Sequence, residues 1–479
     1  MPEGQPVETI DIPPMPWFVR LLRWRYVIPA IVVVGLILSP FVYFQRLVSN
    51  IPDIGDPFDV EAFGTVKIAD EDNAWLDFEA AIDMLVPLPK IPGRDLSTEM
   101  SDAIDNGWPT ATPEIRQWVD DNRPALERWK AGTEKSDFLL EQPKDLHLGL
   151  SLPDVYAVRE IARLAQLEWS RLLTEGNVNE AWIWIRTLYR SSRQIAFHGT
   201  PMQRMLGAVY LVISIKGLEE LTQHPAMTEE LLREILDEVH RRYQTTPAKS
   251  VFVKCDYLTY RNSTNDAEMV AGFLKPGKND TPAEKLHVWF VLKFSFEPRM
   301  AQLIAQHFYA RTLDQVDLPV KDRRPWTGTL TMFEPDSGQS YPMGTLSPTE
   351  IDQFYMKSIL ARSSLKSYRG VDETCLKEES RQYALELWLA LQIFERINGN
   401  FPDDLSDLVV ANIIADIPFD PFSTTGAAMQ YRRDEDTAIV WGIGENYVDD
   451  HGAIDKPVGK LPPDIGMRLG DDGVEAKKP

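Results

Sequence analysis

The residues best suited to chemistry are two adjacent aspartates, Asp449 and Asp450, at the end of residues 442–450 (GIGENYVDD). Ca²⁺ takes about six to eight oxygen ligands at roughly 2.3–2.6 Å, and adjacent carboxylates on a flexible loop supply such ligands. The alternative interpretation is that both side chains are solvated and accept hydrogen bonds from nearby backbone amides, as turn aspartates commonly do. The residues alone leave both interpretations open.

Catalytic patterns are missing from the sequence. A nucleophilic hydrolase needs Ser, His and Asp in a context such as G-x-S-x-G, and neither this motif nor a CxxC or HExxH metal spacing occurs. Among the seven scattered histidines, His198 precedes Gly199 and suits a helix C-terminus better than catalysis. Gly442 and Gly444 lack the third glycine of a dinucleotide-binding loop. The sequence therefore predicts no catalytic or cofactor-binding residue and favours a non-enzymatic protein.

The longest apolar stretch, residues 26–44 (YVIPAIVVVGLILSPFVYF), contains no charge. At ~1.5 Å per residue it makes a helix of about 29 Å, close to the ~30 Å hydrocarbon core of a bilayer, so we predict a single transmembrane helix over residues 26–45. Bulky aromatic residues end the run where a signal peptide has small ones, which indicates an uncleaved signal anchor. Arginines before the run and acids after it place the N-terminus in the cytoplasm and the remaining chain outside.

The composition of the 479-residue chain is strongly acidic, with a formal charge of −22. The three acids and three arginines of residues 1–25 cancel, so the whole excess follows them. Such a surface repels nucleic acid and favours cationic partners, so we expect no nucleic-acid binding. Cys255 and Cys375 are able to pair in an oxidising compartment, although nothing in their spacing requires a disulfide.

Beyond the anchor the hydrophobic pattern predicts a mainly α-helical protein. Apolar residues recur at intervals of three and four through residues 113–243, which predicts an array of antiparallel helices joined by short loops. Residues 245–281 look less regular. Trp182 and Trp184 are two positions apart and point in different directions on a helix, so at least one of them is a candidate for a partner interface.

The last part of the chain changes character. Residues 429–432 and 437–441 are short β-type runs that predict an antiparallel hairpin after a long helix. The predicted organisation is a cytoplasmic tail (1–25), a transmembrane helix (26–45), a neck (46–69), an exported helical domain (70–320), a connector loop (321–348), a C-terminal helix with an α/β module (349–470) and a disordered tail (471–479).

Several short motifs follow one another within residues 384–454. A helix ends in an NGNFP turn, and a short DDLSDL helix, a P-x-D-P-F packing turn at residues 418–422, a two-stranded ribbon and a loop rich in Gly and Asp come after it. This order resembles the C-terminal body of the major pseudopilins of type II secretion systems. The pseudopilin processing sequence is absent from WRYVIPAIVVV, so assembly into a fibre by the usual route is not expected.

The whole chain resembles uncharacterised single-pass membrane proteins of planctomycete-type bacteria, through the segment SRLLTEGNVNEAWIWIRTLYRSSRQ and the pseudopilin-like end. This resemblance implies an exported helical domain before a pseudopilin-like α/β module, and it implies no reaction. In major pseudopilins the loop that corresponds to residues 442–450 resembles a calcium site. The resemblance therefore implies Ca²⁺ as a candidate cofactor, with Asp449, Asp450 and Asp464 as its ligands.

Three functions are compatible with these observations. The leading hypothesis is a membrane-anchored, exported structural or protein-interaction protein of the bacterial envelope, whose partners are the bilayer through residues 26–45 and another envelope protein. The second is an accessory component of a type II secretion or pilus-like apparatus. The third is an envelope hydrolase whose carboxylates are assembled only in the fold, as the two acids of glycosidases are.

Overall fold

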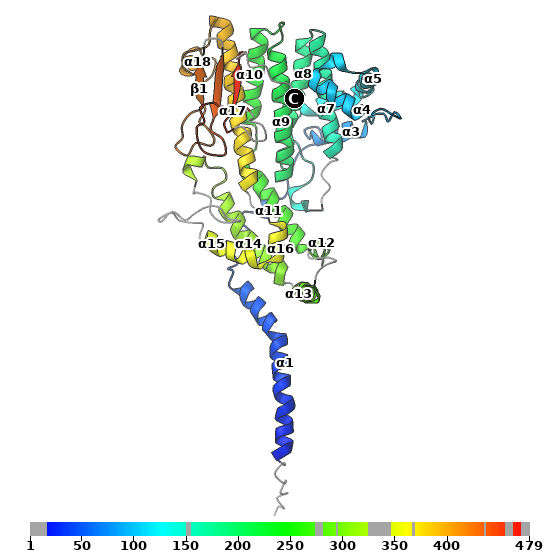
Figure 1. The fold of residues 1–479 in the computed structure, drawn as a ribbon, viewed down its shortest axis with the longest axis vertical. Helices are drawn as coiled ribbons and strands as arrows, with labels where there is room; N and C mark the ends of the chain where they lie inside the picture. The colour runs from blue at the N-terminus through cyan, green and yellow to red at the C-terminus, as the bar shows by residue number, and fades with distance from the viewer. Residues whose placement is uncertain are drawn as a thin grey trace, which may run out of the picture.

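The computed structural model describes residues 17–149, 155–273, 281–293, 296–323, 346–365, 369–434, 437–455 and 463–470. Most of the predicted connector loop, the first sixteen residues of the predicted tail and the whole of residues 471–479 lie outside these ranges. The fold is mainly helical, as predicted, with one small antiparallel sheet and a long apolar helix that projects from an elongated head (Figure 1).

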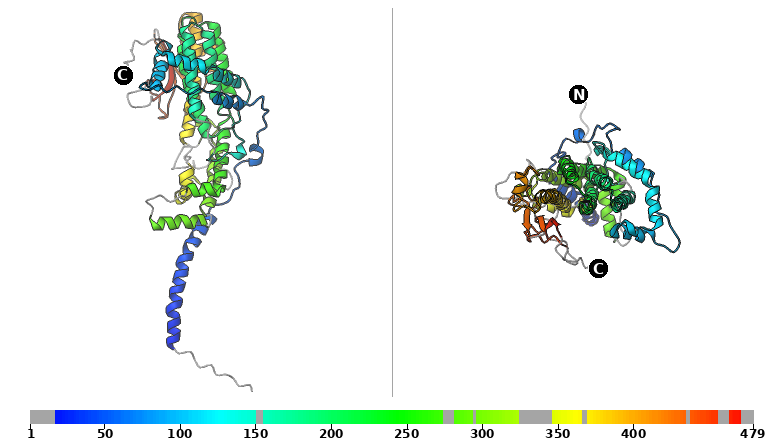
Figure 2. Two further views of the ribbon diagram at one scale, coloured as in Figure 1. Left: turned by 90° about the vertical axis from the view of Figure 1, so that its right-hand side faces the viewer. Right: turned by 90° about the horizontal axis from the view of Figure 1, so that it is seen from above.

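Helix α1 (Trp17–Ser49) is long and apolar enough to cross a membrane. Its span Tyr26–Ser49 has a mean hydropathy of 2.4, and only 6% of the most apolar window is buried in the protein. Pro29 and Pro40 lie inside the helix without ending it. Both views of the molecule show α1 leaving the base of the head, so its apolar surface faces away from the rest of the chain (Figures 1 and 2).

The remaining helices build the head. Short helices follow the neck: α2 (Val60–Phe63), α3 (Trp75–Asp83), α4 (Leu96–Asn106), α5 (Pro113–Asp121) and α6 (Arg123–Thr133), with 3-10 turns at Trp108–Thr110 and Pro143–Asp145. An upper bundle contains α7 (Val155–Thr174), α8 (Val178–Gln194), α9 (Pro201–Thr222) and α10 (Glu229–Gln244). The base contains α11 (Lys249–Asn265), α12 (Ala267–Phe273), α13 (Pro282–Lys293), α14 (Phe296–Leu313), a 3-10 turn (Val320–Asp322), α15 (Pro348–Lys357) and α16 (Ile359–Ser364). Helix α17 (Arg369–Asn398) rises beside the bundle and is followed by α18 (Ser406–Val410) (Figure 1).

Local signals set the ends of the bundle helices. Gly176 follows α7 with a φ of 80°, a left-handed conformation that glycine adopts without strain. At the start of α9, Thr200 and Gln203 form a reciprocal capping box, with Pro201 at the first helical position. The hydroxyl of Thr228 accepts a hydrogen bond from the amide of Leu231 at 3.2 Å and so caps α10. These caps mark where helices of the predicted array begin and end.

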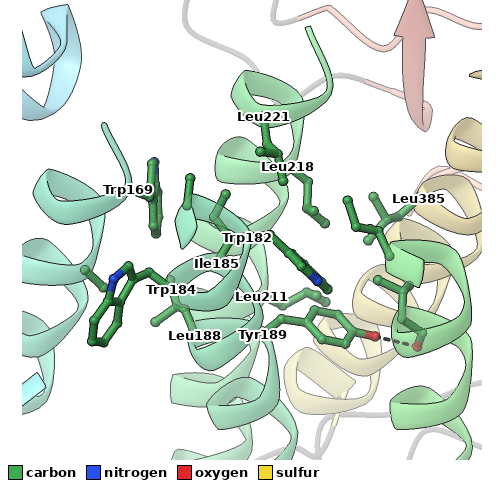
Figure 3. Packing of buried hydrophobic residues seen from close by; sticks show 14 of the residues in the cluster. Trp169, Trp182, Trp184, Ile185, Leu188, Tyr189, Leu211, Leu218, Leu221 and Leu385 are labelled. Carbon is green, nitrogen blue, oxygen red and sulfur yellow. Dashed lines mark hydrogen bonds between the residues drawn. The ribbon is translucent and has the colours of Figure 1, made fainter. Parts of the chain in front are cut away.

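The upper hydrophobic core is centred on α8, which lies between α7 and α9 (Figure 3). Trp182 and Trp184 lie on opposite sides of α8, as expected, but both are buried, so the prediction that one of them forms a partner interface is wrong. The indole Nε1 of Trp182 donates to Glu234 at 2.9 Å, and Lys130 lies 5.1 Å above the ring of Trp184. Both faces of this helix are covered because it is internal to the bundle.

A three-stranded antiparallel sheet packs against α17. Strands β1 (Gln430–Arg433) and β2 (Ala438–Gly442) form the predicted hairpin, and β3 (Ile465–Leu469) adds an unpredicted third strand on the other side of β2. All five residues of β2 are buried, as in a central strand. The indole of Trp388 on α17 donates to the carbonyl oxygen of Arg468 at 3.0 Å, which ties the helix to β3.

A second cluster of buried residues fills the base of the head, next to the end of α1. Here residues 245–281, expected to be irregular, contain helix α11 and helix α12. The ring of Tyr257 on α11 contacts that of Tyr309 on α14 at 5.3 Å between centroids. Aromatic packing of this kind stabilises a helix whose sequence has no clear amphipathic period.

The two cysteines do not pair. Cys255 and Cys375 are both buried and free, and the thiol of Cys255 lies 3.3 Å from the carbonyl oxygen of His198. Burial raises the pKa of both thiols, that of Cys375 to about 12. The head is therefore held together without a disulfide between them.

Candidate functional site

The loop predicted to bind calcium lies beside the sheet, and the structure brings Asp464 next to residues 449–450. The Asp464 side chain is fully buried and accepts hydrogen bonds from the amides of Gly452 at 2.9 Å and Ala453 at 3.2 Å. It also accepts a longer bond, 3.3 Å, from the amide of Asp450. Burial raises the pKa of Asp464, and the three amides oppose that shift.

The two adjacent aspartates also have partners within the protein. Asp449 Oδ1 accepts from the Trp441 indole at 3.0 Å and from the His451 amide at 2.9 Å. Asp450 Oδ2 accepts from Asn446 Nδ2 at 2.6 Å. In the part of the chain that the structure describes, no group of three or more His, Cys, Asp or Glu side chains is arranged to hold a metal ion. The contacts match the alternative of local hydrogen bonding, and the calcium site stays a prediction.

Calcium binding by this loop has a direct consequence for stability. If Asp449 and Asp450 ligate Ca²⁺, the ion stabilises the folded chain by mass action, and melting curves with Ca²⁺ and with a chelator will separate by several degrees. The measurement uses the full chain and a double variant, Asp449→Asn with Asp450→Asn, in which the separation should vanish. Coincident curves for the unaltered protein would remove the site.

Asp420 also belongs to this region, although its motif at residues 418–422 was predicted only to be a packing turn. Phe422 does fill the core, but Asp420 is also buried, and it accepts from the amides of Phe422 at 3.0 Å and Ile443 at 2.7 Å. Burial raises the pKa of Asp420 to about 6, and the negative charges of Asp464 and Asp449 add to that shift. The signal that could have located it is a carboxylate next to buried apolar residues.

The raised pKa of Asp420 predicts a stability change with pH. The folded protein favours the protonated carboxyl of Asp420, because the pKa of this group is about 6 in the folded chain and 3.8 in its ordinary state. The contribution of Asp420 to the free energy of unfolding is therefore fully present below pH 3.8 and is lost as the pH rises through about 6. Between pH ~4 and pH ~7 the free energy of unfolding of the unaltered chain should fall by about 2–3 kcal/mol more than that of the Asp420→Asn variant. Exposed Asp416→Asn is the control. Equal pH dependence in all three proteins would contradict the prediction.

A cleft of about 880 Å³ lies between the helical bundle and the C-terminal module. One wall is α10 and the middle of α17, and the opposite wall is formed by residues 413–426. Residues 317–323 also line the cleft. Because these elements are far apart in sequence, the cleft exists only in the folded head.

A His–Glu contact, a Lys–Glu ion pair and aromatic rings line the helical wall of the cleft. His240 Nδ1 lies 2.9 Å from Glu386 Oε2, and Lys249 Nζ lies 3.1 Å from Glu379 Oε2. The rings of Tyr243 and Tyr383 meet edge to face with centroids 5.6 Å apart. Burial, followed by the charge of Glu379, raises the pKa of both phenols, so they remain neutral hydrogen-bond donors.

The side chains that line the cleft set its charge. Seven of its lining residues are Asp or Glu and four are Lys or Arg, so the lining is acidic overall. Phe419 is 64% exposed on the opposite wall, and Lys321 lies 5.3 Å above its ring. Acids next to accessible aromatic rings favour a cationic ligand, through ion pairing and cation–π contact.

A buried charge network lies behind the helical wall and fixes its shape. Arg193 Nη1 lies 2.5 Å from Glu378 Oε1, and Arg204 Nη2 lies 3.0 Å from Glu378 Oε2. Arg193 also donates to Gln382 at 2.6 Å, and its guanidinium lies 5.3 Å from the ring centroid of Tyr243. The network joins α8, α9 and α17, so the wall is held by a bundle with little freedom to rearrange.

These features define a class of protein: a mainly helical head with an acidic, aromatic cleft, carried on an apolar helix. No protein-family model, curated protein or solved structure matches the chain. The resemblance to pseudopilins and to planctomycete-type membrane proteins therefore stays a prediction. The arrangement in the cleft suits binding, because its two lining glutamates Glu379 and Glu386 are each paired with a basic side chain.

Proposed function

We propose that this is a membrane-anchored protein-interaction protein of the bacterial envelope, and that its cleft binds a cationic peptide segment of another envelope protein. The observation that carries the proposal is the acidic cleft of about 880 Å³ between α10, α17 and residues 413–426. Ligand pockets are typically about 300–1,000 Å³, so the cleft is large enough to hold several side chains of a partner.

The anchoring part of the proposal rests on α1. Its apolar span faces away from the head, and arginines precede it. The positive-inside bias then leaves residues 1–25 in the cytoplasm and the head on the outer side of the membrane. An acidic head outside the cell membrane meets basic segments of envelope proteins, and charge complementarity speeds such encounters.

A peptide explains the distribution of groups in the cleft better than a compact ligand does. The ion pair of Lys249 with Glu379, the pair of His240 with Glu386 and the exposed ring of Phe419 lie on two walls contributed by different elements. A Lys or Arg side chain of a partner would replace Lys249 beside Glu379, or His240 beside Glu386, and lie over an aromatic ring. Successive side chains of one segment are able to engage both walls.

The proposal predicts position-dependent cross-linking in native membranes. A photoreactive amino acid in place of Phe419, at the cleft, should capture a specific envelope protein. The same residue in place of Val410, which is 80% exposed and outside the cleft lining, should capture none or only abundant neighbours. Captured products are identified by mass spectrometry of the purified full-length chain.

Position 410 is the control for position 419. Identical products from both positions, or no product from position 419, would contradict a partner site in the cleft. Where a product forms, adding Glu379→Gln with Glu386→Gln should lower its yield, because these changes remove two of the acids that attract a cationic segment. An unchanged yield would show that the charge of the cleft does not select the partner.

A second candidate function is an accessory role in a type II secretion or pilus-like apparatus. The observation that favours it is the packing of an antiparallel sheet on the long helix α17, in the part of the chain that resembles a pseudopilin body. The cross-linking experiment separates the two proposals. Capture of secretion or pilus components would favour the apparatus, whereas capture of an unrelated envelope protein would leave the pseudopilin-like module as a structural element.

A further inference from the structure

Helix α13 exposes two large apolar side chains at the base of the head. Leu286 is 64% exposed and Trp289 is 57% exposed, and they are three positions apart on one side of the helix. In the part of the chain that the structure describes, both side chains are more than half exposed. The sequence of α13 (PAEKLHVWFVLK) is mostly apolar. Soluble helices of such composition are normally buried, so this surface requires an apolar environment outside the protein.

An aromatic contact joins α1 to the start of α14, the helix that follows α13. Helix α14 begins at Phe296, whose ring stacks on Phe44 with centroids 5.7 Å apart and meets Phe41 edge to face at 5.3 Å. Phe41 and Phe44 are at the end of the charge-free run 26–44. The start of α14 therefore lies at the level where α1 would leave the hydrocarbon core.

The orientation of α13 also suits a membrane surface. Figure 1 shows α13 nearly end-on at the bottom of the head, beside the upper end of α1, whose axis lies in the plane of the picture. The two helices thus cross at a steep angle. If α1 crosses the bilayer, α13 runs along its surface, in the orientation of an interfacial helix.

We propose that α13 lies on the outer surface of the bilayer that α1 crosses, with Leu286 and Trp289 inserted between the lipids. This inference rests on the proposed anchoring by α1. Tryptophan prefers the membrane interface, and the exposed Lys285 and Lys293 place cations at the level of the lipid phosphates. The segment has two lysines and one acid, so it differs in charge from the strongly acidic chain as a whole.

A second attachment point has a mechanical consequence for the head. With a single spanning helix, α1 and the head packed against its end are free to tilt together in the bilayer. Contact of α13 with the lipids restrains that motion and keeps the base, with α14 to α16, against the membrane. The upper bundle and the cleft are then presented at a fixed height above the bilayer.

The test measures the depth of single positions in the full chain, reconstituted at one copy per nanodisc. Leu286→Cys and Trp289→Cys are labelled separately with an environment-sensitive fluorophore; the native Cys255 and Cys375 are buried, and the unaltered chain gives the background labelling. Quenchers are attached to the lipids at shallow or deep positions, or dissolved in water. Val33→Cys in α1 is the probe for the anchor, and Val410→Cys, 80% exposed on α18, is the control for solvent.

We expect a shallow lipid quencher to reduce the emission from positions 286 and 289 by about twofold, since interfacial helices insert roughly 5–10 Å below the surface. Position 33 should respond to the deep quencher and position 410 to the aqueous one. If position 33 responds as expected but positions 286 and 289 respond only to the aqueous quencher, the inference is overturned while the anchor stands. Protection from all quenchers would place α13 against protein and would also overturn it. Failure of position 33 to respond to the deep quencher would overturn the anchor, and the inference with it.

Discussion

Replacing Glu378 by Gln is expected to lower the free energy of unfolding of the head by about 3–5 kcal/mol, the range found when one partner of a buried ion pair is removed. Glu378 is buried and neutralises both Arg193 and Arg204, which are buried as well. An amide of the same shape keeps one acceptor oxygen but leaves two guanidinium groups without a counter-charge. The cost is large because neither arginine is able to reach water without separating α8 and α9 from α17.

The measurement is thermal or denaturant unfolding of the full chain in detergent, monitored by the circular dichroism signal of its helices. The control is Glu180→Gln, which makes the same chemical change at an exposed position on α8 and should alter stability by less than about 0.5 kcal/mol. Similar stabilities for the two variants would mean that the network contributes little to holding α17 in the bundle. A triple change of Glu378, Arg193 and Arg204 to apolar residues should recover part of the loss, because no charge is then left buried.

Replacing Gly207 by Ala is expected to destabilise the protein by about 1–3 kcal/mol, the usual cost of overpacking a core. Gly207 lies where α9 crosses α8, and a Cβ atom there would clash with the backbone carbonyl oxygen of Ser192. That oxygen belongs to helix α8 and cannot rotate away as a side chain does. The two helices would have to move apart, which loosens the packing around Trp182 and Tyr189 shown in Figure 3.

The same substitution at Gly272 provides a matched control with the opposite expected sign. Gly272 is also helical, in α12, but a Cβ atom there meets nothing within 4 Å. Gly272→Ala should therefore stabilise the protein by about 0.4–1 kcal/mol, because alanine has less conformational freedom to lose on folding. If both alanine variants are more stable than the unaltered chain, the α8–α9 contact has more freedom than the structure indicates.

Elements whose signals are local follow from the sequence alone. The apolar run 26–44 produces α1, and periodic apolar residues with caps at Thr200 and Thr228 produce α9 and α10 in the region where an array of helices was predicted. The hairpin of β1 and β2 was also predicted, from β-type residues around a short turn. In each of these elements, neighbouring residues supply most of the information, through hydrogen bonds and side-chain spacing.

Elements stabilised by distant contacts escaped prediction. Helix α11 has no clear period and depends on packing against α14, and β3 is a five-residue strand with Gly466 and Arg468 that forms only because β2 offers a free edge. The burial of Asp420 depends in the same way on residues far along the chain, including Ile443.

Which surfaces remain available to partners depends on the packing of the whole head. Trp182 and Trp184 resembled interface residues and are buried, whereas the cleft between α10, α17 and residues 413–426 and the exposed face of α13 have no local signature. Burial is a property of the whole packing arrangement: a side chain is covered or exposed according to which distant element lies above it. Hydrophobic periodicity specifies that a face must be covered, and the fold decides whether protein, lipid or a partner covers it.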